Sequence, residues 1–115
     1  MHSSSLKDRR CAPCEEGTPA LDDATTHLLL GEVPSWRLDR QPGKPPRIVR
    51  QVEFKDFLAA MGFINKMASI AEDEAHHPDF CVHYNRIDVT LWTHTVGGLS
   101  ENDFILASKL DAVLG

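Results

Sequence analysis

Apolar side chains recur every three or four residues between Lys55 and Glu74, and this spacing restricts the fold more than any other feature of the chain. The apolar positions are Phe57, Leu58, Met61, Ile64, Ala68 and Ala71. Such a repeat predicts a long helix with an apolar stripe that must be buried against another element. Pro78 disfavours helical geometry at the residue before it, so we expect the helix to end near His76.

Segments with strand character lie in pairs on either side of this helix, at residues 36–38, 48–54, 82–84 and 87–93. The first two flank QPGKPP (41–46), whose prolines exclude it from a helix or a central strand. Asn85-Arg86 is the predicted tight turn between the last two. From Ile87 onward, apolar and polar residues alternate, which is strand periodicity. Strands joined by short connections run antiparallel.

Two shorter helices complete the pattern. One is predicted over 22–30, with Asp22 as its N-cap and Gly31 as its end. The last follows Ser100, which with Asp103 outlines a capping box, and its apolar positions are Phe104, Ala107, Leu110, Val113 and Leu114. We therefore predict an α+β fold, a four-stranded antiparallel sheet with three helices packed on one face. Its open face and exposed edge strands favour oligomerisation.

Residues 1–19 contain few large apolar side chains, unlike the rest of the chain. We expect a flexible N-terminal tail at 1–19, or an arm laid on the body, and a single domain at 20–115. The formal net charge of −5 argues against nucleic acid or an anionic membrane surface as a partner. No apolar run approaches the roughly 20 residues of a membrane span. Residues 1–10 lack the apolar region of a secretory signal, so we expect a cytoplasmic protein.

Three cysteines do not make a disulfide framework. Cys11-Ala12-Pro13-Cys14 is an isolated CxxC, whereas a structural zinc site needs about four ligands. The pair does not follow a strand, which disfavours a thioredoxin-like role. Cys81 lies in an apolar segment, and we expect it to be a small buried side chain.

Four of the six histidines lie close together in the sequence: His76, His77, His83 and His94. Glu72 precedes His76 by four residues, so a continuing helix would bring the two within hydrogen-bonding reach. His94 ends a strand and Asp103 begins a helix, and a compact sheet can bring such element ends together. Imidazole–carboxylate pairs suit proton transfer, because histidine titrates near neutral pH and a carboxylate fixes its tautomer.

Other interpretations of these residues stay open at this level. A single histidine near a loop is most often a polar surface residue, Glu72 can be a solvated acid, and Asp103 can be a helix cap. Histidines with a carboxylate can also bind a divalent metal, although the adjacent His76 and His77 point in different directions. The chain has no phosphate-cradling glycine loop, and Ser100 is better explained as a cap than as a nucleophile.

Several ordered motifs resemble those of the pterin-4a-carbinolamine dehydratase family, which are E-x3-H-H-P, Y-N, T-L-x-T-H and G-L-[ST]-x-x-D at similar spacings. The chain has EDEAHHP at 72–78, YN at 84–85, TLWTH at 90–94 and GLSEND at 98–103. Upstream, FKDF at 54–57 is similar to the start of the family's long helix, and Trp36 matches a tryptophan of its first strand. The resemblance covers about Leu21 to Leu114.

The resemblance implies a dehydratase that acts on 4a-hydroxytetrahydropterin (4a-hydroxytetrahydrobiopterin), the product that aromatic amino acid hydroxylases release. Loss of water gives the quinonoid dihydropterin, so the activity would recycle the hydroxylase cofactor. The resemblance also implies a homodimer or homotetramer with no metal and no organic cofactor. The alternative is a non-catalytic oligomerisation, assembly or dimerisation-cofactor module on the same fold, and the histidines distinguish the two.

The same resemblance assigns individual residues. It implies proton transfer by His76, His77 and His94, with Glu72 and Asp103 as the acidic positions. The residues expected to contact the pterin are His76, His77, Pro78, Thr93, His94, Thr95 and Val96. Because the resemblance begins near Leu21, we expect the tail to be dispensable for catalysis.

Overall fold

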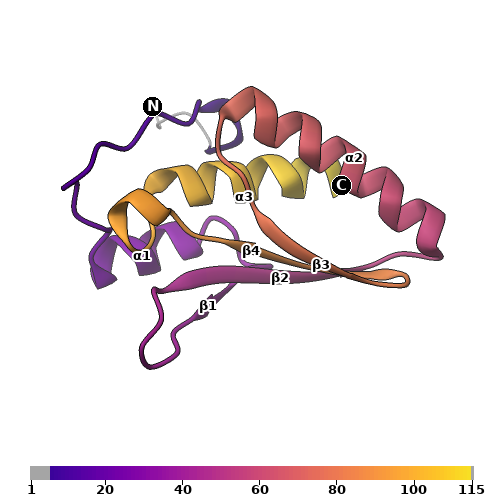
Figure 1. The fold of residues 1–115 in the computed structure, drawn as a ribbon, viewed down its shortest axis with the longest axis horizontal. Coiled ribbons are helices and arrows are strands. Elements are labelled where there is room, and N and C mark those ends of the chain that lie inside the picture. Colours follow the sequence, from indigo (N-terminus) through magenta and orange to yellow (C-terminus); the bar gives the residue numbers. More distant parts are fainter. Residues whose placement is uncertain (1–5, 115) are drawn as a thin grey trace.

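Two hairpins of extended residues form the sheet in the computed structural model, which describes residues 6–114 (Figure 1). One hairpin pairs β1 (Arg37–Asp39) with β2 (Arg47–Glu53), and the other pairs β3 (Asp79–His83) with β4 (Arg86–Leu91). β2 and β4 join the hairpins, so the strand order is β1-β2-β4-β3 and all neighbours are antiparallel. The predicted four-stranded antiparallel sheet is confirmed.

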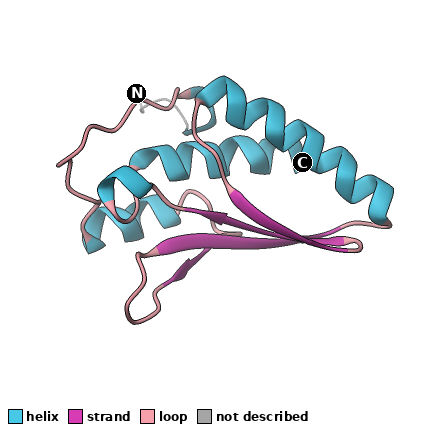
Figure 2. Cartoon of the chain, viewed as in Figure 1, coloured by secondary structure: helices cyan, strands magenta, loops and turns pink. Residues whose placement is uncertain are grey.

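Three α-helices lie on one face of the sheet, which confirms the predicted α+β class (Figure 2). α1 (Asp23–Leu30) begins where the Thr25 N–H donates to Asp22 Oδ1 at 2.8 Å, as the predicted N-cap requires. α2 (Phe57–Glu74) is capped in the same way by Asp56. α3 (Glu101–Leu114) packs against α2, so these two helices cover the sheet together.

The hydrophobic core lies between the sheet and the two long helices. Ile87, Val89 and Leu91 alternate along β4 and are buried, as the sequence periodicity predicts. Their partners in the core include Ile48 from β2, Met67 from α2, and Phe104, Leu106 and Leu110 from α3. Each such side chain stabilises the fold by about 1.5–3 kcal/mol on burial, so the paired faces hold β4 and α3 in a fixed relation.

α2 buries Ile64 and Ala71 of the predicted stripe, but the rest of its buried face differs from the prediction. Its buried residues are Ala60, Phe63, Ile64, Met67, Ala71 and Glu74. Phe57, Leu58 and Ala68 are exposed, although the sequence spacing predicted that they face the core. The helix carries apolar residues on more than one row, and periodicity alone does not show which row meets the sheet. Phe57 and Leu58 in the first turn, and Ala68 further along, therefore remain on the outside of α2.

The second hairpin also differs from prediction. β3 is longer than the predicted 82–84, and Tyr84 and Asn85 form its turn, one residue earlier than expected. Tyr84 takes the turn with a φ of 57°. β3 has β4 as its single neighbour in the sheet, so it is an edge strand, and most of its side chains are exposed. Cys81 is consequently exposed rather than buried.

Residues 6–19, here called the arm, run along the helices before α1 begins (Figure 1). A 3₁₀ turn at its start (η1, Leu6–Asp8) packs on α3, and Leu6 is 1% exposed within the core. Of the two interpretations of the tail, the arm laid on the body is the one observed, and Leu6 is an apolar anchor that we did not expect. Residues 1–5 of the predicted tail lie outside the described residues, and the domain boundary at residue 20 stays a prediction.

Candidate active site

The end of α2 decides which carboxylates the adjacent histidines meet. Ala75 has a left-handed backbone, with φ 54° and ψ 36°. The N–H groups of Ala75 and His76 donate to the carbonyls of Glu72 and Ala71 at 3.3 and 3.2 Å, which closes a Schellman motif. The chain leaves the helix before His76, so Glu72 and His76 do not share a helical face. The predicted Glu72–His76 pair is wrong for this reason, and each residue has another partner.

His76 pairs with Asp103 of α3 in the interior. Its Nε2 lies 2.6 Å from Asp103 Oδ1, and the two side chains are 12% and 0% exposed. The other oxygen of Asp103 accepts from the Thr93 hydroxyl at 2.8 Å and from the Ser100 N–H at 3.0 Å. A buried carboxylate with this set of donors holds the imidazole with its proton on Nε2. Within residues 6–114, Nδ1 of His76 has no hydrogen-bond partner.

His77 points away from the interior and pairs with Glu72 on the surface. Its Nε2 lies 2.5 Å from Glu72 Oε2, with 59% of the His77 side chain and 77% of the Glu72 side chain exposed. Both predicted acidic residues therefore bind a predicted histidine, but Glu72 pairs with His77 instead of His76.

His94 lies outside both of these pairs and stacks on Trp92. The two ring centroids are 3.7 Å apart with planes at 30°. Trp92 Nε1 donates to Asp79 Oδ2 at 3.2 Å, which ties the indole to the start of β3. His94 is exposed and begins the short 3₁₀ turn η2 (His94–Val96). The stack restricts the orientation of the imidazole ring, while the residue as a whole stays exposed.

A tight loop brings Thr93 and Ser100 to Asp103. Thr93 and Gly98 exchange backbone hydrogen bonds of 2.7 and 3.3 Å, and Gly97 between them has a φ of 66°. The predicted capping box forms only in part, because the Ser100 hydroxyl bonds to Thr93 Oγ1 at 2.7 Å while its N–H meets Asp103. The first turn of α3 is in this way joined to the end of β4.

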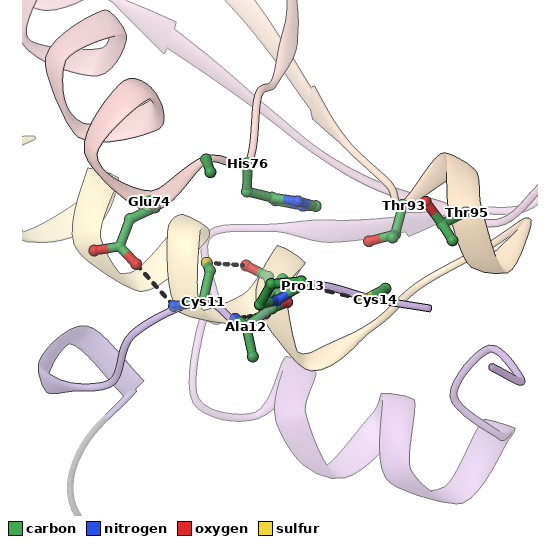
Figure 3. A pocket seen from close by; sticks show the side chains of 10 residues that line it. Cys11, Ala12, Pro13, Cys14, Glu74, His76, Thr93 and Thr95 are labelled. Atoms are coloured by element: carbon green, nitrogen blue, oxygen red, sulfur yellow. Dashed lines mark hydrogen bonds between the residues drawn. The ribbon is translucent and has the colours of Figure 1, made fainter. Parts of the chain in front are cut away.

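A cavity of about 220 Å³ opens beside His76 (Figure 3). The domain contributes Glu74, Ala75, His76, Thr93, Thr95 and Asn102 to its lining, and the arm contributes residues 11–14. Of the predicted pterin contacts, His76, Thr93 and Thr95 line this cavity, whereas His77, Pro78, His94 and Val96 are not part of its lining. The structure thus brings together part of the predicted site and adds the arm to it.

The arm is tied to the domain at the cavity by hydrogen bonds of its backbone. Asn102 Nδ2 donates to the Ala12 carbonyl at 2.6 Å, and the Ala12 N–H donates to Asn102 Oδ1 at 3.0 Å. The Cys11 N–H donates to Glu74 Oε1 at 2.7 Å. Both thiols also meet Asn102, Cys11 Sγ at its carbonyl and Cys14 Sγ at its amide, each at 3.6 Å.

Glu74 is a buried carboxylate between two cations. Its side chain is 2% exposed, and its Oε2 lies 3.4 Å from Arg10 Nε and 3.6 Å from Lys109 Nζ. Burial opposes the charge, but the Cys11 N–H and the two cations outweigh it and lower the pKa of Glu74. Burial, together with the nearby Glu74 carboxylate, raises the pKa of the Cys11 thiol to about 12. Cys11 is therefore a neutral thiol near pH 7 and a poor nucleophile.

The sequence profile of the family described as Pterin 4 alpha carbinolamine dehydratase matches residues 19–113. The chain belongs to this family. Two relatives carry the family's enzyme name. One, from Dechloromonas aromatica, is 41% identical over 112 residues, 97% of this chain and 96% of the relative. The other, from Nitrosomonas eutropha, is 43% identical over 110 residues, 95% of this chain and 93% of the relative.

Solved structures of this pterin dehydratase family share the fold. A protein from Brucella melitensis, described as a transcriptional coactivator/pterin dehydratase, superposes with a TM-score of 0.75 at 36% identity, covering 84% of this chain and 99% of that one. A pterin dehydratase-like protein described as a RuBisCO assembly factor in the alpha-carboxysome gives 0.59 at 26% identity, covering 70% of this chain and 90% of that one. The alignment with the Dechloromonas relative omits three of the 115 residues, so the arm has a counterpart there.

Sequence reasoning missed Asn102, Glu74 and the arm as parts of the cavity beside His76. Asn102 and Glu74 lie within the matched motifs, but at positions where the motifs accept other residues, so no spacing marked them. The CxxC of the arm is recognisable in the sequence, but no sequence pattern indicates that it lies near the histidines. Among residues 6–114, no group of three or more His, Cys, Asp and Glu side chains is arranged to hold a metal ion. No helix of the described chain is long and apolar enough to cross a membrane.

Proposed function

We propose that this protein removes water from a 4a-hydroxytetrahydropterin, such as 4a-hydroxytetrahydrobiopterin, and releases the quinonoid dihydropterin. The C4a–O bond breaks and the hydroxyl leaves as water after it accepts a proton. N5 loses its proton, and its electron pair forms the C4a=N5 double bond. Protons and electrons balance without an oxidant or a reductant, so one acid and one base suffice. Membership of the family supports this substrate class.

The His76–Asp103 pair is the observation that carries this proposal. It places an imidazole at a cavity, backed by a buried carboxylate that holds its proton on Nε2. Nδ1 is then the ring nitrogen that exchanges protons with a bound pterin. The hydrogen bond between His76 and Asp103 is shielded from water, because both side chains are largely buried.

His77 and His94 complete the proposed proton-transfer set. His77 carries its own carboxylate, Glu72, and His94 is oriented by the Trp92 ring. Both imidazoles are exposed, so each can return its proton to water between turnovers. In this proposal the hydroxyls of Thr93 and Thr95 hydrogen-bond the polar edge of the pterin, with Pro78 and Val96 at its margin.

The setting that we propose follows from the same family. The protein acts in the cytoplasm as a homodimer or homotetramer, beside an aromatic amino acid hydroxylase that supplies its substrate, and needs no metal or organic cofactor. The exposed Phe57 and Leu58 and the free edge of β3 support self-association. Exhaustive chelation is expected to leave the rate unchanged; a stoichiometric metal whose removal abolishes turnover would contradict this.

The test is the dehydration rate of 4a-hydroxytetrahydropterin made in the assay by a hydroxylase, after subtraction of the spontaneous rate. Wild-type protein is expected to accelerate the reaction. His76→Ala should lose about 10²–10⁴-fold, the typical contribution of a positioned acid or base. His83→Ala is the matched control, because His83 is an exposed histidine of β3 that has no part in the proposed proton-transfer set. Wild-type protein with no acceleration would rule out the dehydratase function.

A non-catalytic assembly role is the second candidate. The likeness to the RuBisCO assembly factor and the exposed Phe57 and Leu58 of α2 favour it. A module of this kind depends on its contact surface and has no need of His76. Leu58→Glu would then abolish its function while His76→Ala would not, which is the reverse of the pattern expected for a dehydratase.

A further inference from the structure

The cavity beside His76 has two walls that come from opposite ends of the sequence. In Figure 3, His76 and Thr93 lie on one side, and arm residues 11–14 lie on the other. The arm therefore closes the side of the cavity that faces His76. This is unexpected for a segment that we predicted to be dispensable for catalysis.

The first turn of α3 holds both walls. Asp103 binds His76, and the preceding Asn102 binds Ala12 through a pair of hydrogen bonds between its amide group and the Ala12 backbone. The amide of Asn102 thus acts toward the arm as a neighbouring strand would, with one donor and one acceptor. Since Asn102 and Asp103 are consecutive on one helix, the spacing between the imidazole and the arm is set by a rigid element.

A second anchor keeps the arm in place without any ligand. Glu74 accepts from the Cys11 N–H, and its charge is matched by Arg10 of the arm and Lys109 of α3. Leu6 is buried in the core at the start of the arm. The arm is consequently anchored at three points: Leu6 in the core, Cys11 at Glu74, and Ala12 at Asn102.

We propose that arm residues 11–14 form one wall of the pterin site and that Asn102 is the positioning residue that sets this wall against His76. This inference rests on the dehydratase function proposed above and deepens it. A flat heterocycle fits between an imidazole and an opposing stretch of backbone, where Pro13 offers apolar surface and Cys14 a thiol. The arm contributes to binding of the ring, so its loss acts mainly on KM rather than on kcat.

The first test compares Asn102→Ala with Asn65→Ala, a matched change at an exposed position of α2. Asn102→Ala should raise KM about tenfold with kcat within about threefold, and circular dichroism should show an intact fold. Release of the arm should also speed alkylation of Cys11, whose thiol is held neutral by burial in the wild type. Asn65→Ala should change neither quantity. Faster alkylation of Cys11 with an unchanged KM would overturn the proposal.

The second test does not depend on the folding of the Asn102 variant. Cys14→Phe places a phenyl ring in the cavity wall, and Glu16→Phe places the same ring on an exposed arm position outside the lining. KM should rise at least tenfold for Cys14→Phe and stay unchanged for Glu16→Phe. An unchanged KM in Cys14→Phe would overturn the proposal whatever the Asn102 variant does.

Direct binding separates failure of this inference from failure of the proposed function. The Kd of a stable 7,8-dihydropterin is measured by calorimetry for the wild type and both arm variants. If the wild type binds the pterin but shows no turnover, the dehydratase function fails, and a Kd raised about tenfold in Cys14→Phe still supports the wall. Equal Kd values in the wild type and both arm variants, or no binding of the pterin by the wild type, would overturn the proposed wall.

Discussion

Two neighbouring histidines each bind a carboxylate at nearly the same distance, yet their surroundings are opposite. His76 and Asp103 approach to 2.6 Å with the carboxylate fully buried. His77 and Glu72 approach to 2.5 Å with most of both side chains in solvent. A hydrogen bond between an imidazole and a carboxylate is screened less in a protein interior than at a water-exposed surface. The environment, and not the distance, therefore determines what each pair contributes.

The partners of the two carboxylates differ as well. Asp103 also accepts hydrogen bonds from Thr93 and Ser100, so it joins β4, α3 and the His-His-Pro segment. The side-chain carboxylate of Glu72 has no second hydrogen-bond partner among the described residues. The buried carboxylate thus links three segments of the chain, whereas the surface carboxylate bonds to His77 alone.

Asp103→Ala is expected to have the largest effect of any change at these pairs. It leaves the Thr93 hydroxyl, the Ser100 N–H and His76 without an acceptor, which should lower the free energy of unfolding by about 3–5 kcal/mol. Urea denaturation measures this. Asp103→Asn is the control, because its carbonyl still accepts from α3 while its amide can donate to His76. We expect it to recover much of the stability but not the rate, since His76 then takes the other tautomer.

An Asp103→Ala protein as stable as the wild type would show that the buried pair contributes no more than the exposed one.

His77→Ala and His94→Ala should each cut the dehydration rate, by about 10²–10⁴-fold, without unfolding the protein. Both histidines are exposed, so their removal leaves no cavity. Thermal midpoint and single-turnover rate are measured on the same samples. The double variant should lose less than the sum of the two single losses if the histidines act as one unit. Normal rates in both folded variants would remove them from the mechanism and favour the assembly role.

Glu74 extends the comparison to a third carboxylate, which is buried but faces the arm. Its pKa is lowered below the ordinary 4.5 by the Cys11 N–H, Lys109 and Arg10, which outweigh its burial. A lowered pKa means that the ionised carboxylate stabilises the fold above pH 4.5 and that this contribution is lost as the pH falls further. Thiols react with alkylating reagents too slowly in acid to report on the position of the arm, so hydrogen exchange of the Cys11 N–H is measured instead. In the wild type, this N–H should lose protection as the pH falls below 4.5. Glu74→Gln should remove this loss of protection in acid. An identical pH dependence of exchange in the wild type and in Glu74→Gln would contradict the prediction.

Glu72→Gln is expected to have the smallest effect on stability. The free energy of unfolding should change by less than about 1 kcal/mol, because an exposed ion pair is screened and costs side-chain entropy. The dehydration rate should fall less than in His77→Ala, since Glu72 orients the imidazole and does not itself move the proton. A larger loss of rate than in His77→Ala would assign Glu72 a direct role in proton transfer.

Local sequence signals predicted most of the fold. The alternation along β4 and the proline-rich connection between β1 and β2 led to the antiparallel sheet, and Asp22 marked the start of α1. Each of these signals acts over a few residues, so tertiary contacts seldom reverse it. The motifs around His76, His94 and Asp103 likewise indicated the family before any geometry was known.

Other features were decided by contacts that no local pattern encodes. α2 has apolar residues on more than one row, and only packing against β4 and α3 selects the row of Phe63 and Met67. Glu72 and His76 do not pair because Ala75 ends the helix with a left-handed residue, although nothing in its side chain requires that conformation.

The sequence by itself determined the elements, their order and the residue types of the site, because helix and strand periodicity and capping are local. Only the tertiary structure paired His76 with Asp103 across 27 residues and placed Ala12 against Asn102 across 90. Contacts between such distant residues depend on how the sheet and α3 pack, and a buried hydrogen bond forms only where that packing excludes water. The wall that the arm adds to the cavity exists for the same reason.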